Sequence, residues 1–148
     1  VKYEVDKDSG LLHVDRFSAT SMIYPFNYGF VPNTLCDDGD PLDVMVLAPF
    51  PIQPGAVVRV RPIGVLLMTD EAGIDPKVLA VPVDKLSKAY SDVTEPEHIT
   101  RSVLETIEHF FQHYKDLDSG KWVKIDGWQN AAAAKQAVVE AVEAFTGS

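Results

Sequence analysis

The stretch from Arg61 to Pro82 reads "RPIGVLLMTDEAGIDPKVLAVP" and places two apolar runs on either side of an acidic turn. The first run belongs to a long strand predicted over residues 56–69, and the second predicts a strand over residues 78–83. Because the chain turns back between the two runs, the acidic residues of the turn lie at one end of the predicted sheet. The stretch therefore predicts a β-sheet with Asp70, Glu71 and Asp75 at one of its ends.

Further strands are predicted on both sides of this stretch. Residues 2–17 are typical of a hairpin, because two alternating runs flank the turn-forming "DKDSG". Residues 22–35 are rich in aromatic side chains but are interrupted by proline and glycine, so we expect irregular or edge-strand structure there. The runs "VMVLAPF" over residues 44–50 and "KWVKIDGW" over residues 121–128 predict one buried strand and one short strand. Within the long strand, Arg59 and Arg61 are expected to share a face.

The hydrophobic period changes from strand to helix in the second half of the chain. Between Pro96 and Lys115 apolar residues recur at helical spacing, with Pro96 expected in the first turn and Thr94 as its cap. Asn130 is expected to cap a second helix that runs through Phe145, with an apolar stripe at Val138, Val142 and Phe145. Strands followed by helices predict an α+β fold, a small twisted barrel with two packed helices.

Length and composition indicate one ordinary globular domain over residues 1–148, with 46% hydrophobic and 24% charged residues. A net charge of −9 and a pI near 4.7 argue against nucleic-acid binding and against docking on an anionic membrane. The longest apolar runs are too short to span a bilayer. A single cysteine excludes an intramolecular disulfide, and we expect the cytoplasm as the compartment.

A second acidic segment, "CDDGDPLDV" from Cys36 to Val44, concentrates four aspartates in nine residues. Two carboxylates about 5 Å apart repel each other by about 3 kcal/mol at an effective dielectric constant of 20. Either the segment is a solvated turn or a cation offsets this repulsion. An EF-hand does not fit, because Asp43 stands where that loop requires glycine if Asp38 is taken as its first position. The remaining cation site is one for magnesium or manganese.

Basic and phenolic side chains elsewhere match these carboxylates in chemistry. They are Lys2, Arg16, Tyr24, Tyr28, Tyr114 and Lys115, accompanied by Glu4 in the first strand. Each also has a purely structural explanation. The tyrosines are compatible with core packing, and Lys2 and Glu4 are compatible with an exposed ion pair worth well under about 1 kcal/mol.

The sequence closely resembles the soluble family I inorganic pyrophosphatases of the bacterial type over essentially its whole length. The resemblance rests on "KYEVDKDSG", "VDRF", "YPFNYGFVPNT", "DGDPLDVMV", the stretch quoted first, and "HFFQHYKDLDSGKWVKIDGW". It implies an OB-like five-stranded β-barrel with two α-helices. Members of that family carry an additional N-terminal segment, which includes a strand with a further active-site glutamate, so we expect this chain to lack that segment.

The resemblance also implies a reaction and its residues. Pyrophosphate would be hydrolysed to two orthophosphates by a metal-bridged water, with Asp40 as candidate general base. Asp38, Asp70 and Asp75 would bind one magnesium, Asp43 a second, and Glu4 would assist further metals. Manganese or zinc are expected substitutes for magnesium. The two phosphates would be held by Lys2, Arg16, Tyr28, Lys77, Tyr114 and Lys115, with Tyr24 in support. The assembly implied is a cytoplasmic homohexamer.

Other functions remain open from the residues alone. A nonenzymatic OB-like binding module would need a basic and aromatic groove, which the net charge opposes. A calcium-binding structural domain is opposed by the spacing of the acidic loop. His109 and His113 are four residues apart, but Phe110 stands where a metalloprotease helix carries glutamate, so zinc-protease chemistry is not predicted. Cys36 is expected to be a small half-buried side chain and not a nucleophile.

Overall fold

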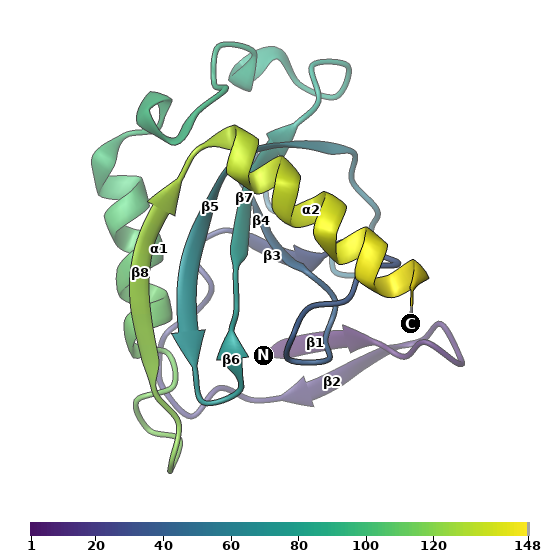
Figure 1. The fold of residues 1–148 in the computed structure, drawn as a ribbon, viewed down its shortest axis with the longest axis vertical. Coiled ribbons are helices and arrows are strands. Elements are labelled where there is room, and N and C mark those ends of the chain that lie inside the picture. The colour runs from purple at the N-terminus through teal and green to yellow at the C-terminus, as the bar shows by residue number, and fades with distance from the viewer. Residues whose placement is uncertain (148) are drawn as a thin grey trace.

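The structure is a computed structural model that describes residues 1–147, so the last residue of the predicted domain, Ser148, lies outside the described residues. Figure 1 shows a curved sheet with one helix on each side and a hairpin below it. The strands are β1 (Lys2–Val5), β2 (Leu12–Arg16), β3 (Asn27–Phe30), β4 (Asp43–Val46), β5 (Val60–Asp70), β6 (Gly73–Ile74), β7 (Lys77–Pro82) and β8 (Val123–Gln129). The α-helices are α1 (Arg101–His113) and α2 (Ala131–Thr146), preceded by the short 3₁₀ turns η1 (Lys88–Tyr90) and η2 (Pro96–His98).

The main sheet has the strand order β3-β4-β7-β5, and both β8 and the short β6 pair with β5. β4 and β7 are parallel, whereas the pairs β3–β4, β5–β7 and β5–β8 are antiparallel. β1 and β2 form a separate antiparallel hairpin. This is the expected α+β, OB-like barrel, and the predicted hairpin, edge strand and buried strands are confirmed. The long strand starts later than predicted, at Val60, so Arg59 precedes it.

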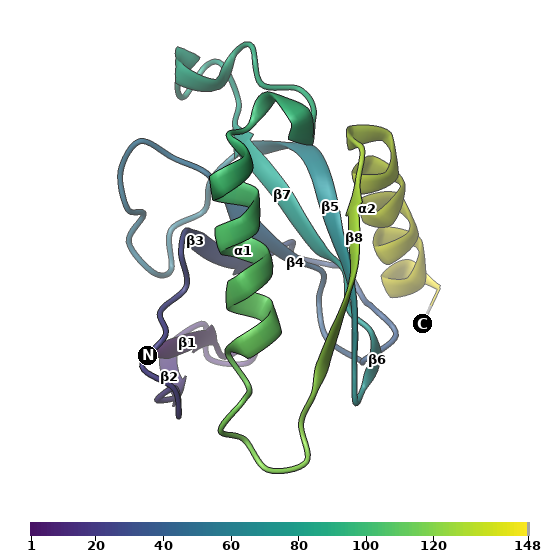
Figure 2. The same ribbon diagram turned by 90° about the vertical axis from the view of Figure 1, so that its left-hand side faces the viewer.

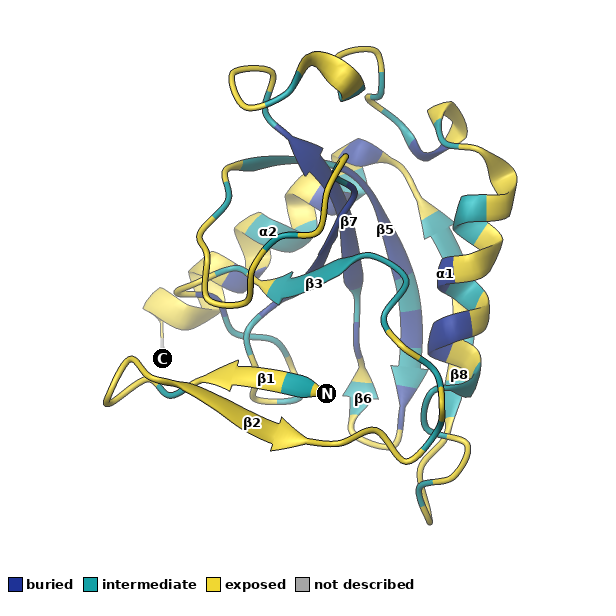
Figure 3. Cartoon of the chain, turned by 180° about the vertical axis from the view of Figure 1, so that it is seen from behind, coloured by how far each residue is buried: buried dark blue, intermediate teal, exposed yellow. Residues whose placement is uncertain are grey.

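The sheet is buried on both faces because each helix covers one of them, as Figure 2 shows. Alternate residues of β4 and β7 therefore enter two different cores. Met45 and Leu79 pack in the core that includes Ile107, Phe110 and Phe111 of α1. Their neighbours Val44 and Val78 pack in the core that includes Ala134 and Ala141 of α2. All six residues of β7 are buried, whereas β1 and β2 are exposed along almost their whole length (Figure 3).

The first helix begins later than predicted. α1 starts at Arg101, and Pro96 instead opens η2, where Glu95 and not Thr94 is the N-cap. Glu95 and His98 form a capping box that closes this short turn, and Ile99 then returns to extended backbone. The Pro96 ring also lies against Gly64 of β5, where an added Cβ would come within 2.5 Å of the ring. Pro96 therefore belongs to a short turn that packs on the sheet, and the helix begins only after this turn.

The second helix has the predicted cap, but its apolar stripe matches the prediction only at Val138. Asn130 Oδ1 accepts a hydrogen bond from Ala133 N at 2.9 Å, which confirms the N-cap. The buried positions are Ala131, Ala134 and Ala141, whereas Val142 and Phe145 are 40% and 44% exposed. Val138, the third member of the predicted stripe, is partly buried and packs against the same core as Ala134 and Ala141. Within residues 1–147, neither α-helix combines the length and the apolar character that crossing a membrane requires.

Candidate active site

A cavity of about 640 Å³ opens at the end of the sheet where both acidic segments lie. It is lined by residues from the hairpin, the sheet, the end of α1 and the segments between them. The predicted site residues that line it are Lys2, Arg16, Tyr24, Tyr28, Asp38, Asp40, Asp43, Asp70, Asp75, Lys77, Tyr114 and Lys115. The fold therefore brings together residues that are far apart in the sequence.

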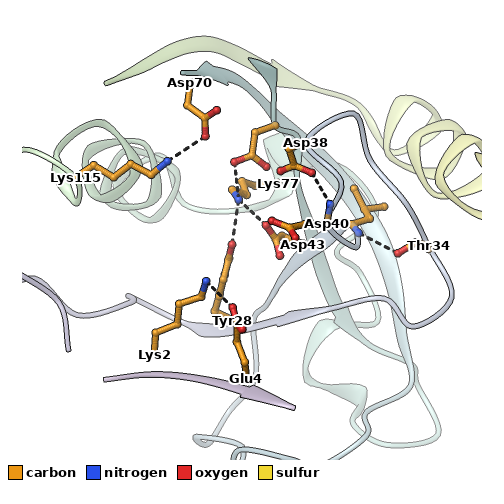
Figure 4. A network of polar contacts seen from close by, with 12 residues as sticks. Lys2, Glu4, Tyr28, Thr34, Asp38, Asp40, Asp43, Asp70, Lys77 and Lys115 are labelled. Carbon is orange, nitrogen blue, oxygen red and sulfur yellow. Dashed lines mark hydrogen bonds and ion pairs between the residues drawn. The ribbon is translucent and has the colours of Figure 1, made fainter. Parts of the chain in front are cut away.

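Lys77 is a buried cation in the lining of this cavity, and Figure 4 shows its polar contacts. The parallel register of β4 and β7 places Asp43 directly beside it. Its Nζ lies 2.6 Å from Asp43 Oδ2 and 3.0 Å from Asp75 Oδ2, and it donates to Tyr28 Oη at 3.0 Å. The Lys77 side chain is only 4% exposed. A buried ammonium needs such partners, because its desolvation is otherwise costly.

Burial and these contacts shift the pKa values of the cluster. Burial acts to lower the pKa of Lys77, but its contacts with Tyr28, Asp43 and Asp75 outweigh this, and the pKa is raised well above its ordinary value. Burial raises the pKa of Asp75 to about 6 although Lys77 acts in the opposite direction. Burial also raises the pKa of Tyr28, so its hydroxyl keeps its proton and can donate a hydrogen bond.

A second group of ion pairs in the cavity lining is centred on Lys115. Lys115, just after α1, approaches Asp70 Oδ2 at 3.0 Å and Glu71 Oε1 at 3.6 Å. Asp70 Oδ1 also accepts a hydrogen bond from Ala72 N at 2.8 Å. Burial acts to raise the pKa of Asp70, but the bonds from Lys115 and Ala72 prevail and lower it. Asp70 is thus held ionised at the end of β5.

The acidic loop that precedes β4 presents two more carboxylates. Asp38 Oδ1 accepts a hydrogen bond from Asp40 N at 3.0 Å, which folds the loop tip around Gly39. Gly39 has φ 86°, a left-handed conformation that glycine adopts without steric cost. Burial raises the pKa of Asp38, and the carboxylates of Asp40 and Asp43 add to that effect. Asp40 itself is exposed and faces the cavity.

Stacked aromatic rings form one wall of the cavity. Tyr24 stacks on Tyr28 with ring centroids 4.3 Å apart, and Phe110 stacks on Tyr114 at 5.2 Å. Both Tyr24 and Tyr114 pack against the α1 core. Tyr24 and Tyr114 therefore pack in the core and also line the cavity. Core packing and a role at the site, the two explanations that the sequence left open, are compatible with each other.

The hairpin supplies the exposed side of the site. Arg16 Nε lies 2.5 Å from Asp15 Oδ2, and the Arg16 side chain is 54% exposed. Lys2 Nζ pairs with Glu4 Oε1 at 3.0 Å, the ion pair that the spacing allowed, with the side chain of Lys2 32% exposed and that of Glu4 53% exposed. Glu4 is the predicted site residue that does not line the main cavity, and it faces a second hollow on the hairpin.

Sequence reasoning missed several residues at this site. Glu71, Asp118 and Lys121 were given no role at the site, yet all three line the cavity. Asp15 holds Arg16 and lies 3.8 Å from Lys2. Two of these residues could have been found from the sequence, because Glu71 follows Asp70 in the acidic turn and Asp15 precedes Arg16. Asp118 and Lys121 lie in an irregular segment, whose folding back onto the cavity no local pattern predicts.

The carboxylates of the cavity suit a hard divalent cation. Acidic side chains outnumber basic ones in the lining of the cavity. Their carboxylate oxygens are the kind of ligand that magnesium and manganese prefer. Across residues 1–147, the side chains do not form a compact group of three His, Cys, Asp or Glu residues able to hold a metal. Magnesium completes its shell with water and substrate phosphates, so its carboxylate ligands need not form such a compact group in advance. The donors present therefore fit magnesium.

Comparison with known proteins gives a consistent result. A family model described as inorganic pyrophosphatase matches residues 1–146. The inorganic pyrophosphatase 1 of Pseudomonas syringae pv. tomato is 60% identical over 147 residues, which cover 99% of this chain and 84% of that protein. The inorganic pyrophosphatase of Pseudomonas aeruginosa is 61% identical over 98% of this chain and 83% of its own length.

Solved structures agree with the sequence matches. A structure from Anaplasma phagocytophilum, described as an inorganic phosphatase, superposes with a TM-score of 0.96 at 51% identity over 99% of this chain and 85% of that one. The inorganic pyrophosphatase of Helicobacter pylori superposes with a TM-score of 0.95 at 46% identity, covering 99% of this chain and 86% of that one.

Proposed function

Because the chain belongs to the inorganic pyrophosphatase family, we propose that it hydrolyses inorganic pyrophosphate to two orthophosphates in the cavity at the end of the sheet. The observation that carries this proposal is the meeting of carboxylates, lysines, one arginine and phenols around that cavity. Hydrolysis of a phosphoanhydride depends mainly on positioning and on neutralising charge, and this set of side chains supplies both.

We assign the carboxylates to magnesium, with manganese or zinc as substitutes. Asp38, Asp70 and Asp75 would hold one ion and Asp43 a second, with Glu4 near further ions that accompany the substrate. The chemistry supplied by bound magnesium is neutralisation of the phosphate oxygens and acidification of water. Asp75 supports this assignment. Burial destabilises its charged form and raises its pKa to about 6, and a bound cation would stabilise that charged form.

The remaining residues bind the substrate and move the proton. Lys77, Lys115, Lys2 and Arg16 would pair with the phosphate oxygens through charge-assisted hydrogen bonds. Tyr28 and Tyr114 would donate hydrogen bonds without adding charge, because burial raises the pKa of both phenols. Asp40 is the proposed general base, since its carboxylate is exposed at the cavity and can accept the proton of an attacking water.

We further propose a homohexamer in the cytoplasm. Exposed apolar side chains support an assembly, among them Tyr3 and Val14, which are opposite each other on the hairpin. The net negative charge and the single cysteine agree with the compartment. Light scattering after size exclusion tests the assembly, and a monomeric mass would contradict it.

The test of the reaction is phosphate release from pyrophosphate, with and without magnesium, for the unaltered chain and two variants. Asp40→Asn removes the proposed base, whereas Asp37→Asn removes the same charge from an exposed position in the same loop. We expect magnesium-dependent release that falls at least about a hundredfold in Asp40→Asn and stays near the original rate in Asp37→Asn. Absence of release from the unaltered chain would contradict the function, and equal losses in both variants would contradict the role of Asp40.

A further inference from the structure

Thr34 is a buried polar residue at the base of the acidic loop, and the proposed mechanism gives it no role. It follows Asn33, which has φ 58°, and only 3% of it is exposed. A left-handed non-glycine residue marks a tight local constraint on the chain. Thr34 therefore stands where the backbone turns into the loop that carries Asp38 and Asp40.

The Thr34 hydroxyl joins the two ends of this loop, and Figure 4 draws one of the two hydrogen bonds that it makes. Its Oγ1 donates to Val31 O at 2.5 Å and accepts a hydrogen bond from Leu42 N at 2.9 Å. Leu42 is 0% exposed, so water cannot readily replace the hydroxyl as partner of its amide. The hydroxyl is thus a donor on one side of the loop and an acceptor on the other.

Backbone bonds complete this closure. Val31 N donates to Leu42 O at 2.9 Å, and Cys36 N donates to Asp40 O at 2.8 Å. Leu35 N donates to Ala141 O at 3.0 Å, which ties the loop to α2. Leu42 lies two residues after Asp40 and immediately before Asp43, so a shift of Leu42 would move both carboxylates.

We infer that Thr34 is a positioning residue for hydrolysis, whose hydroxyl sets the loop geometry that aims Asp40 at the reacting water. The inference rests on the proposed function of the cavity. The groups proposed to bind phosphate lie on other elements, including Tyr28 on β3 and Lys77 on β7. Loss of the hydroxyl therefore changes the turnover rate more than the binding of substrate.

Thr34→Val and Thr34→Ser separate the hydroxyl from the shape of the side chain. Valine keeps the branched shape without the hydroxyl, and serine keeps the hydroxyl. We expect kcat to fall about tenfold in Thr34→Val while KM stays within about twofold, and Thr34→Ser to recover most of kcat. The control is Ile63→Val, a buried change toward the opposite end of β5 that weakens packing but should leave kcat and KM unchanged.

Backbone amide NMR shifts of residues 36–43 test the loop geometry whether or not the chain hydrolyses pyrophosphate. Shifts that change in Thr34→Val and return in Thr34→Ser support the inference. Unchanged shifts in a folded Thr34→Val protein, or an equal loss of kcat in Thr34→Val and Ile63→Val, would overturn it. If Thr34→Val does not fold, Thr34→Ala takes its place. Failure of both to fold would also overturn the inference, because Thr34 would then support the whole fold and not the loop.

Discussion

The two sides of the cavity are built in different ways. On one side, β4 and β7 hold Asp43 and Lys77 in paired register, with Lys77 buried between two carboxylates. On the other side, the β1–β2 hairpin presents Lys2 and Arg16 from strands that are mostly exposed. Both sides supply charges to the same cavity, but only the first is fixed by the core of the protein.

This difference separates the effects expected on stability from those expected on binding. The charges of Lys77, Asp43 and Asp75 are largely removed from water, so each is stabilised mainly by the opposite charge beside it. Loss of one charge leaves its partner buried and unpaired. Charges on the hairpin are solvated and screened, so they contribute little to folding. The hairpin charges are therefore expected to act on substrate binding and hardly on stability, whereas Lys77 acts on both.

The largest effect is expected for Lys77→Met. The change leaves Asp43 and Asp75 without their shared cation, so the free energy of unfolding should fall by about 3 kcal/mol. Turnover should fall about a hundredfold, because a preorganised cation is lost from the phosphate site. Urea unfolding in metal-free buffer and phosphate release measure the two effects. Lys135→Met, an exposed lysine on α2, is the control and should change neither. A loss of stability no larger than that of the control would contradict the distinction between the two regions.

An intermediate effect is expected for Arg16→Gln on the hairpin. Its side chain is 54% exposed, so urea unfolding should be unchanged, whereas KM for pyrophosphate should rise about tenfold through loss of one charge-assisted hydrogen bond. Arg59→Gln removes an exposed arginine just before β5, at the end away from the cavity, and should leave KM as it is. A marked destabilisation by Arg16→Gln would show that the hairpin belongs energetically to the core.

The smallest effect is expected for Glu4→Gln. Glu4 pairs with Lys2 in solvent, so unfolding should change by less than about 1 kcal/mol, and added salt should reduce the difference further. A double-mutant cycle with Lys2→Gln isolates the pair energy. A coupling well above 1 kcal/mol would mean that the hairpin pair behaves like the buried cluster.

Local patterns predicted most of the fold and missed what depends on distant contacts. Alternating and apolar runs were sufficient for the hairpin and for β4, β5, β7 and β8. The start of α1 was wrong because Pro96 packs on Gly64, a contact 32 positions away in the chain that helical spacing does not encode. The stripe of α2 was wrong in part: Val138 packs against the core as predicted, but Val142 and Phe145 are exposed and alanines take the buried positions. Which positions of a helix are buried depends on the shape of the opposing sheet, which the helical period does not encode.

The site was predicted largely through the family resemblance, because the residues alone left structural explanations open. Nothing local pairs Asp43 with Lys77, whose contact depends on the register of two parallel strands. Nor does the sequence show that Glu4 does not line the main cavity although Lys2, two residues earlier on the same strand, does. The assigned roles of these residues remain predictions for the variants above.

The position of β7 has a consequence for the fluctuations of the molecule. This strand lies between β4 and β5, and all its residues are buried. Its amide protons should therefore exchange with deuterium only when the whole domain unfolds, whereas those of β1 and β2 should exchange through local opening. The wall of the cavity formed by β7 then stays intact as long as the protein is folded, whereas the wall formed by β1 and β2 opens many times during that period.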